Sequence, residues 1–249
     1  MLYIMRESLE KNTEASSVSE DIFQKLRESI VVGEIPAGSK LSEPVLAREY
    51  GISRGPLREA LSRLEACNLV ERLPNIGASV VKLSEQRLMD IYQIREVLEG
   101  LAAREAAASI TQSELTGLRE LLEKHKEKIN QDQEHTYFQK EGDFDFHFRI
   151  VQASKNNHLI SLLCNDLYYL HRLYRYQFGM PNSDRSNTAL KEHKAIVDAI
   201  ENQDAELAEI LMRRHIKASR INVVKRLNIN TDNLVSYSPQ LNNQKRKHS

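Results

Sequence analysis

The sequence predicts a mainly helical protein, with a small unit of helices and strands near its N-terminal end and an all-helical body after it. Apolar residues recur at helical spacing through most of the chain. Two β-branched runs flank an Asn-Ile-Gly turn within residues 70–83, which is a hairpin signal. Beyond about residue 84 glycines are few and no convincing strand pattern occurs. The fold class is therefore α, with one small hairpin.

Composition narrows the possible partners. The 249 residues include 35 Lys and Arg and 35 Asp and Glu, so an anionic partner must meet a local patch and not the whole molecule. The two cysteines, Cys67 and Cys164, lack the spacing of a disulfide framework. No apolar run approaches the ~20 residues of a membrane span, and charge comes too early for a secretory signal. We expect a soluble, cytoplasmic protein that has no membrane partner.

Residues 1–17 are polar and predict a flexible arm, whereas residues 18–83 predict the first domain. A helix over 18–32 ends in G-E-I-P-A-G-S-K. The segment S-E-P-V-L-A-R-E-Y predicts a short second helix with Ser42 as its N-cap and Pro44 in its first turn. A tight Gly51 turn leads to a third helix, R-G-P-L-R-E-A-L-S-R-L-E-A-C-N-L, capped by Ser53. With the hairpin behind it, this order is typical of a winged helix-turn-helix.

The third helix carries chemistry suited to a DNA major groove. Its opening turn is small and basic, while its leucines fall on the other side. Helix-end amides attract phosphate, small side chains permit close approach, and Arg reads guanine. Residues 1–84 hold eleven Lys and Arg against twelve Asp and Glu, so the basic footprint must be focal and two heads should act together. The candidate DNA-binding residues are Ser53, Arg54, Gly55 and Arg58, with Arg48 and the wing residue Gly77.

Residues 84–226 predict a second domain made of helices. Apolar spacing places them at about 84–108, 111–130, 134–154, 157–178, 187–202 and 204–226. Residues 227–249 are rich in Asn and Ser, end in basic residues, and predict a disordered tail.

The segment D-F-D-F-H-F-R-I, residues 143–150, fits a strand or a helix equally well. The alternation fails at Val151 and Gln152, so the longer segment favours a helix. In that helix Asp143 and His147 lie one turn apart within the apolar stripe, and Asp145 and Arg149 are spaced for an ion pair on the other side. A buried carboxylate needs a partner or a metal ion.

Two later helices each place a histidine on an apolar face. His193 lies with Leu190, Val197 and Ile200 in one of them, and His215 lies with Leu211 in the other. A single histidine on an apolar helix face is usually a core residue with its hydrogen bonds satisfied. Three such faces on three helices favour a metal-binding site. Three imidazoles and one carboxylate suit a divalent transition metal such as Zn²⁺, Ni²⁺ or Mn²⁺. The predicted ligands are Asp143, His147, His193 and His215.

The stretch L-A-R-E-Y-G-I-S-R-G-P-L-R-E-A-L-S-R-L-E-A-C-N-L-V-E-R resembles the GntR family of bacterial transcription regulators over roughly residues 18–83. The resemblance implies that Arg54 and Arg58 contact DNA and that Ser53, Gly55 and Gly77 assist. Gly55 stands where Thr is frequent, and Cys67-Asn68 where an acid-Gly pair is common. Pro44 replaces a basic residue that some members use on DNA. These departures concern the operator sequence and not the class.

The segments I-Y-Q-I-R-E-V-L-E-G-L-A-A-R-E-A-A and D-F-D-F-H-F-R-I-V-Q-A-S-K-N-N-H-L look like the FCD effector domain of the FadR-type branch, over about residues 85–225. Metal-binding members use Asp, three residues, His and two later His, which match Asp143, His147, His193 and His215. Arg95 is a candidate contact for an anionic effector, with a helix-surface ion pair as the alternative.

These features together predict a homodimeric transcription regulator and not an enzyme. Its heads would bind a pseudo-palindromic DNA operator, and its body would hold a divalent metal and a small organic-acid effector. Two alternatives use the same residues. The cluster could activate water in a hydrolase-like domain, or it could be a metal-free polar core. No separate general base stands out in the sequence for the hydrolase.

Overall fold

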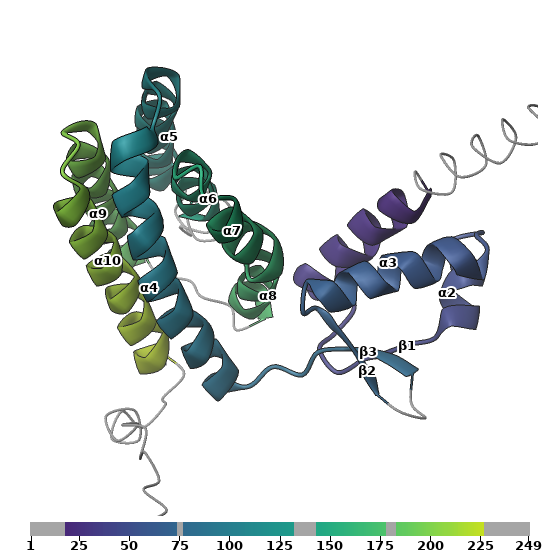
Figure 1. The fold of residues 1–249 in the computed structure, drawn as a ribbon. Coiled ribbons are helices and arrows are strands. Elements are labelled where there is room, and N and C mark those ends of the chain that lie inside the picture. The colour runs from purple at the N-terminus through teal and green to yellow at the C-terminus, as the bar shows by residue number, and fades with distance from the viewer. Residues whose placement is uncertain (1–17, 74–76, 132–142, 178–182, 227–249) are drawn as a thin grey trace, which may run out of the picture.

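The computed structural model describes residues 18–73, 77–131, 143–177 and 183–226, in a head and a helical body joined by a short linker (Figure 1). A first helix covers residues 18–31 and is called the N-terminal helix below. The head continues with β1 (Lys40–Leu41), α2 (Glu43–Glu49), α3 (Arg54–Ala66), β2 (Val70–Leu73) and β3 (Gly77–Val80). The body contains α4 (Glu85–Ser109), α5 (Gln112–Gln131), α6 (Asp143–Ala153), α7 (Asn157–Ile160), the π-helix η2 (Ser161–Asp166), α8 (Tyr168–Gln177), α9 (Ser183–Glu201) and α10 (Ala205–Arg226).

The head has the predicted winged helix-turn-helix architecture. Strands β2 and β3 form the expected antiparallel hairpin, and the residues of its turn, 74–76, lie outside the described ranges. A two-residue strand, β1, was not predicted; it pairs with β3 and completes a sheet of order β1-β3-β2. So short a strand leaves no periodic signal. The sheet ties the wing to the segment that precedes α2.

The core of the head explains why the opening turn of α3 faces outward. Leu57, Leu61 and Leu64 of α3 are fully buried, together with Leu26 and Ile30 of the N-terminal helix. Because these leucines are spaced three and four residues apart, they fix one face of α3 inward. Gly51 makes the turn before α3 with φ +64°, a conformation that other residues adopt only with strain.

The long helix α4 is the centre of the body and lies antiparallel to α10. Arg104 pairs with Glu209, and Glu96 pairs with Arg220, so residue numbers fall on one helix as they rise on the other. Gly100 lets the two helices approach closely, because a Cβ atom there would stand 2.5 Å from Arg213 Cγ. Helix α10 thus holds α4 along most of its length.

Two of the helix predictions have specific outcomes. Residues 143–153 form α6, which confirms the helical interpretation, and Arg149 Nη2 lies 3.1 Å from Asp145 Oδ2 as its spacing predicts. The part of that predicted helix over 134–142 lies outside the described ranges. The single helix predicted over 157–178 is instead α7, η2 and α8 in succession. The amide of Leu167 bonds the carbonyl of Leu162, five residues back, which is the hydrogen bond of a π-helix.

The predicted arm and tail, residues 1–17 and 227–249, lie outside the described ranges. None of the helices in the described part of the chain has an apolar stretch long enough to cross a membrane.

Candidate metal centre and nucleic-acid interface

Three histidines from three helices meet inside the body. His147 comes from α6, His193 from α9 and His215 from α10, and all three side chains are buried. His215 Nε2 lies 3.2 Å from His193 Nε2 and 3.2 Å from His147 Nε2. Among the described residues, these three histidines are the single group that could hold a metal ion, and their ligand atoms all lie within 4.8 Å of one another.

Carboxylates fix the outer nitrogens of two of these rings. Glu99 Oε2 lies 2.6 Å from His147 Nδ1, and Glu192 Oε2 lies 2.6 Å from His215 Nδ1. A carboxylate accepts a hydrogen bond from the nitrogen that it faces, so the neutral tautomer carries its hydrogen on Nδ1 and its lone pair on Nε2. His193 stacks on Phe146 with ring centroids 3.7 Å apart. The lone pairs of His147 and His215 are therefore aimed at one point.

Each of these carboxylates is held in turn by an arginine. Arg95 Nε donates to Glu99 Oε1 at 2.5 Å, and Arg185 donates to both oxygens of Glu192 at 2.8 and 2.7 Å. Burial raises the pKa of Glu99, but the charges of Arg95 and His147 outweigh it and lower the pKa to about 2. Burial also raises the pKa of Glu192, yet its hydrogen bonds with His215 and Arg185 bring it below the usual value. Both glutamates are thus ionised at neutral pH.

The three nitrogens fit a transition-metal ion. Nitrogen atoms bound to one zinc ion at about 2.0–2.1 Å in a tetrahedral site stand about 3.3 Å apart, close to the 3.2 Å that separates His215 Nε2 from each of the other two. Carboxylates behind ligating histidines are a common feature of such sites. Asp143, the remaining predicted ligand, is the first residue of α6, one turn before His147. For Asp143 the structure describes the backbone and not the side chain.

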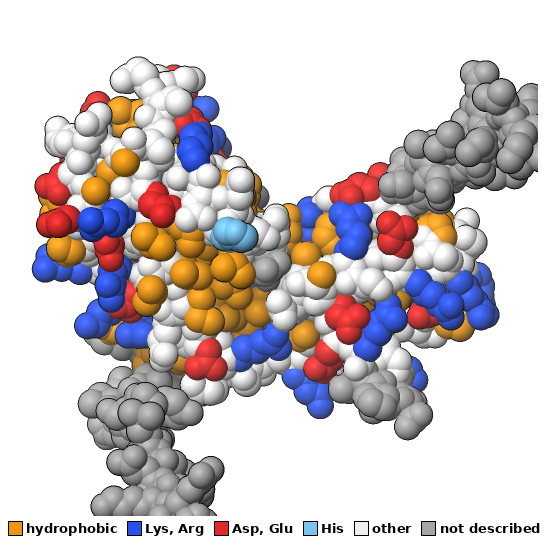
Figure 2. Space-filling view, viewed as in Figure 1, with side chains coloured by type: hydrophobic (Ala, Val, Ile, Leu, Met, Phe, Trp, Pro, Cys, Tyr) orange, Lys and Arg blue, Asp and Glu red, His pale blue; other side chains and the backbone are white. Residues whose placement is uncertain are grey.

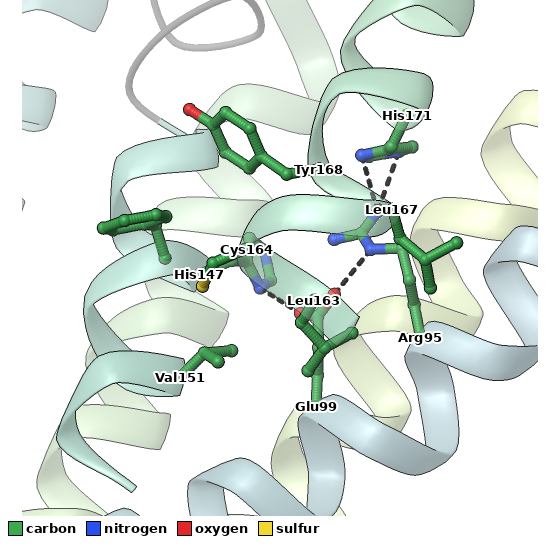
Figure 3. Close-up of a pocket in the computed structure, with 10 residues that line it drawn as sticks. Arg95, Glu99, His147, Val151, Leu163, Cys164, Leu167, Tyr168 and His171 are labelled. Atoms are coloured by element: carbon green, nitrogen blue, oxygen red, sulfur yellow. Dashed lines mark hydrogen bonds and ion pairs between the residues drawn. The ribbon is translucent and has the colours of Figure 1, made fainter. Parts of the chain in front are cut away.

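A pocket opens beside the histidine cluster (Figure 3). Its cavity volume, taken as the space open to the centre of a water-sized sphere, is about 30 Å³. Arg95 lies at one end, where its Nη1 stands 2.8 Å from His171 Nε2, and Glu99 lies between Arg95 and His147. Burial raises the pKa of the Cys164 thiol to about 12, so this lining residue is a poor nucleophile. The lining consists of Arg95, Glu99, His147, Phe148, Val151, Leu163, Cys164, Leu167, Tyr168 and His171.

Sequence reasoning missed the residues around the histidines. Arg95 and Glu99 do form an ion pair with i,i+4 spacing, but it is buried and not on the helix surface. A helical wheel of α4 places both among Leu88, Tyr92 and Ala102, which was a usable signal. Glu192 and Arg185 are seven residues apart on α9, a spacing that alone indicates nothing about His215.

The residues predicted to contact DNA all belong to the head. Helix α3 begins at Arg54 with Ser53 as its N-cap, and the predicted residues of its opening turn are exposed. Arg48 is exposed at the last turn of α2, and Gly77 starts β3 with φ +94°. Arg58 Nε bonds Glu43 Oε2 of α2 at 2.7 Å, so this arginine already has an acidic partner. All of the predicted DNA-contacting positions are thus exposed on the head.

A winged helix-turn-helix on an all-helical body is the architecture of a DNA-binding transcription regulator. Residues 18–80 match the model of the bacterial regulatory proteins of the gntR family, and residues 90–218 match the FCD domain. The chain belongs to the GntR family, in the branch that carries an FCD domain. It is a regulator and not an enzyme.

Named relatives agree with this assignment. The chain is 31% identical over 189 residues to the uncharacterized HTH-type transcriptional regulator YdhC of Bacillus subtilis, covering 75% of this chain and 82% of the relative. It is 28% identical over 200 residues to the HTH-type transcriptional repressor RspR of Escherichia coli, covering 80% and 86%.

Two solved structures show the same fold. E. coli McbR/YncC aligns with a TM-score of 0.67 and 21% identity, over 85% of this chain and 98% of that one. A putative GntR regulator from Rhodococcus sp. RHA1 aligns with a TM-score of 0.66 and 21% identity, over 86% and 99%.

Proposed function

We propose that this regulator holds a divalent transition metal on His147, His193 and His215, with Asp143 as a further ligand, and that a small carboxylate effector binds beside it. The observation that supports the metal most strongly is the convergence of three imidazole Nε2 atoms, two of them on rings fixed by glutamates. Such a metal would supply a Lewis-acidic contact for an anionic group. Zn²⁺, Ni²⁺ and Mn²⁺ all remain candidates by ligand type.

The effector would occupy the pocket that adjoins the histidines. Arg95 lines this space with a guanidinium that also pairs with Glu99, and His147 borders the same space. The apolar side chains of Val151, Leu163 and Leu167 line the rest. This lining suits a small organic acid whose carboxylate faces the metal and Arg95 while its carbon skeleton faces the apolar wall.

Operator binding would use the exposed opening turn of α3, with Ser53, Arg54, Gly55 and Arg58 as the reading residues and Arg48 and Gly77 as neighbours. A relative carries the name of a transcriptional repressor, which favours repression here. This role goes with a cytoplasmic location, where the operator DNA is found.

A homodimer would bring two heads to a pseudo-palindrome, and the outer face of α4 and α10 supports one. Among the described residues, six of the eight exposed large hydrophobic side chains lie on these helices. On each helix the exposed apolar side chains form a stripe, which stands about 100° around the helix axis from the residues that contact the other helix. Because α4 and α10 are antiparallel, the two stripes then lie on the same side of the helix pair. Figure 2 shows apolar side chains gathered over α4. The stripes are Ile94, Val97 and Leu101 on α4, and Leu207, Ile210 and Ile221 on α10.

Metal analysis of the purified protein tests the central proposal. Elemental analysis of the full chain should find about one transition metal per chain, and His193→Ala should lose it. His158→Ala, at an exposed histidine of α7, is the matched control and should keep it. A wild-type protein without bound metal after incubation with Zn²⁺, Ni²⁺ or Mn²⁺ would instead support the metal-free polar core.

Thermal-shift measurements against a panel of small carboxylic acids test the effector. An acid that binds should raise Tm in wild type, do so less after chelation, and do so least in Arg95→Ala. An acid that stabilises Arg95→Ala as strongly as wild type would place the effector elsewhere.

Light scattering tests the dimer surface. Val97→Lys combined with Ile210→Lys should shift the protein toward monomer, because it places four charges in a twofold interface. Val45→Lys, at an exposed apolar residue of the head, is the control. An unchanged mass in the double variant would exclude this face.

A further inference from the structure

Helix α8 borders the pocket on one face and the DNA-binding head on another. Tyr168 and His171 line the pocket, and His171 contacts Arg95. Tyr169 and Arg172, the next residues around the helix, contact the N-terminal helix instead. Figure 1 shows α8 at the edge of the body that faces the head.

The contacts between α8 and the head are polar and specific. Arg27 Nη1 donates to Tyr169 Oη at 2.8 Å, and the guanidinium carbon of Arg27 lies 4.2 Å from the Tyr169 ring centroid. Arg172 Nη1 lies 3.4 Å from Glu28 Oε2. Tyr174 Oη accepts from the amide of Ser84 at 3.1 Å, at the N-cap of α4. One helix therefore holds both the head and the linker.

The contact at Tyr169 continues through the head to the DNA-reading helix. Arg27 also lies over the ring of Phe23, 5.4 Å from its centroid, and Phe23 is buried. Arg63 of α3 covers the same ring at 4.1 Å. Cations and aromatic faces at these distances attract each other. A continuous stack of side chains thus runs from α8 to α3 through Tyr169, Arg27, Phe23 and Arg63. It is called the Tyr169–Arg63 stack below.

We propose that α8 transmits the state of the pocket to the DNA-reading helix through the Tyr169–Arg63 stack. The inference rests on the proposed function, since the pocket must bind something for its state to change. A group that binds Arg95 or His147 competes with contacts that lead to α8, because Arg95 holds Glu99 on one side and His171 on the other. A shift of α8 moves Tyr168 and Tyr169 together, so it changes the position of the side chain that Arg27 contacts. The change in Arg27 then alters the position of α3.

Hydrogen exchange of the full chain, with Mn²⁺ or with chelator, tests the transmission without a known operator. In wild type, Mn²⁺ should slow amide exchange in α6 and α9, where it binds, and also change exchange in α3. Tyr169→Ala and Arg27→Ala should keep the response of α6 and α9 but reduce that of α3 at least about threefold. Lys25→Ala, at an exposed residue of the N-terminal helix, is the control and should respond as wild type does.

A double-mutant cycle in chelator tests the same coupling without metal. Exchange rates in α3 are compared for wild type, Arg95→Ala, Arg27→Ala and the double variant. The two side chains are not in contact, so without transmission their effects add. With transmission, we expect the two effects to depart from additivity by about 2-fold to 30-fold in rate.

The two experiments separate the two ideas. If Mn²⁺ changes nothing in α6 and α9, the metal proposal fails and the double-mutant cycle alone decides the transmission. Additive effects in that cycle overturn the inference. The inference is also overturned if α3 responds to Mn²⁺ as strongly in both Tyr169→Ala and Arg27→Ala as it does in wild type.

Discussion

The carboxylate of Glu192 lies 2.6 Å from His215 Nδ1, on the opposite side of the ring from the other two histidines. Glu99 stands in the same relation to His147. An arginine holds each glutamate in turn, so the body contains two Arg–Glu–His series that end at one point. The orientation of both rings is set before any ligand arrives.

Replacing either glutamate should weaken the metal site without emptying it. Glu192→Gln and Glu99→Gln each keep the side-chain volume but remove the charge that fixes the Nδ1 proton. We expect metal affinity to fall about 10- to 100-fold in each variant, which competition with a chromogenic chelator measures. Glu209→Gln, whose surface carboxylate pairs with Arg104, should bind metal as wild type does. Equal affinity in all four proteins would contradict the role given to these carboxylates.

The acidic partner of Arg58 should restrain DNA binding. Because DNA must displace Glu43 from Arg58, Glu43→Gln is expected to tighten binding about two- to fivefold, the range of an exposed ion pair. Arg58→Ala should weaken binding to a selected operator about 10- to 100-fold if this arginine reads a base. Fluorescence anisotropy at several salt concentrations measures both. Arg104→Ala, on the body, is the control, and a loss there as large as in Arg58→Ala would locate binding elsewhere.

A methyl group at Gly100 should separate α4 from α10. The added Cβ would meet Arg213 Cγ at 2.5 Å and Cδ at 3.0 Å, near the root of that side chain. Overpacking costs about 1–3 kcal/mol and the gain in helix propensity returns about 1 kcal/mol, so Gly100→Ala should lose up to about 2 kcal/mol in urea unfolding. Gly55→Ala, where a Cβ meets nothing within 4 Å, should lose no stability.

The pH dependence of stability should include a contribution from Glu114. Its hydrogen bonds with Lys155 and with the amide of Thr111 lower its pKa from 4.5 to about 2. A lowered folded-state pKa stabilises the fold above about pH 4.5, and this contribution is lost as pH falls toward 2. Since the pair is partly exposed, Glu114→Gln should cost only about 0.5–1 kcal/mol at pH 7. In thermal melts by circular dichroism, the gap to wild type should close below pH 4.5, whereas exposed Glu120→Gln should show no such gap.

Local spacing was sufficient to predict the elements and the histidines. Helical period, caps and turns are properties of neighbouring residues, so α3, the hairpin and α6 followed from the sequence. His147, His193 and His215 could be placed on inward faces for the same reason. That they meet depends on three helices packing together, and the structure shows that they do.

What could not be predicted depends on tertiary packing. No spacing rule connects Glu192 to His215 or Arg27 to Tyr169, because these partners come from different helices. Arg95 and Glu99 were a partial exception. Charged i,i+4 pairs usually lie on surfaces, and that expectation led away from their buried position among apolar neighbours.

The π-helix η2 contributes Leu163 and Cys164 to the pocket wall and leads directly into α8. A π turn holds about one residue more than an α turn, so rewinding η2 as α-helix would release one residue and turn α8 by about 100°. The chain thus holds one surplus residue beside the pocket. Deleting one residue from η2 would let this segment wind as α-helix while α8 keeps its place, so this segment can absorb a one-residue deletion.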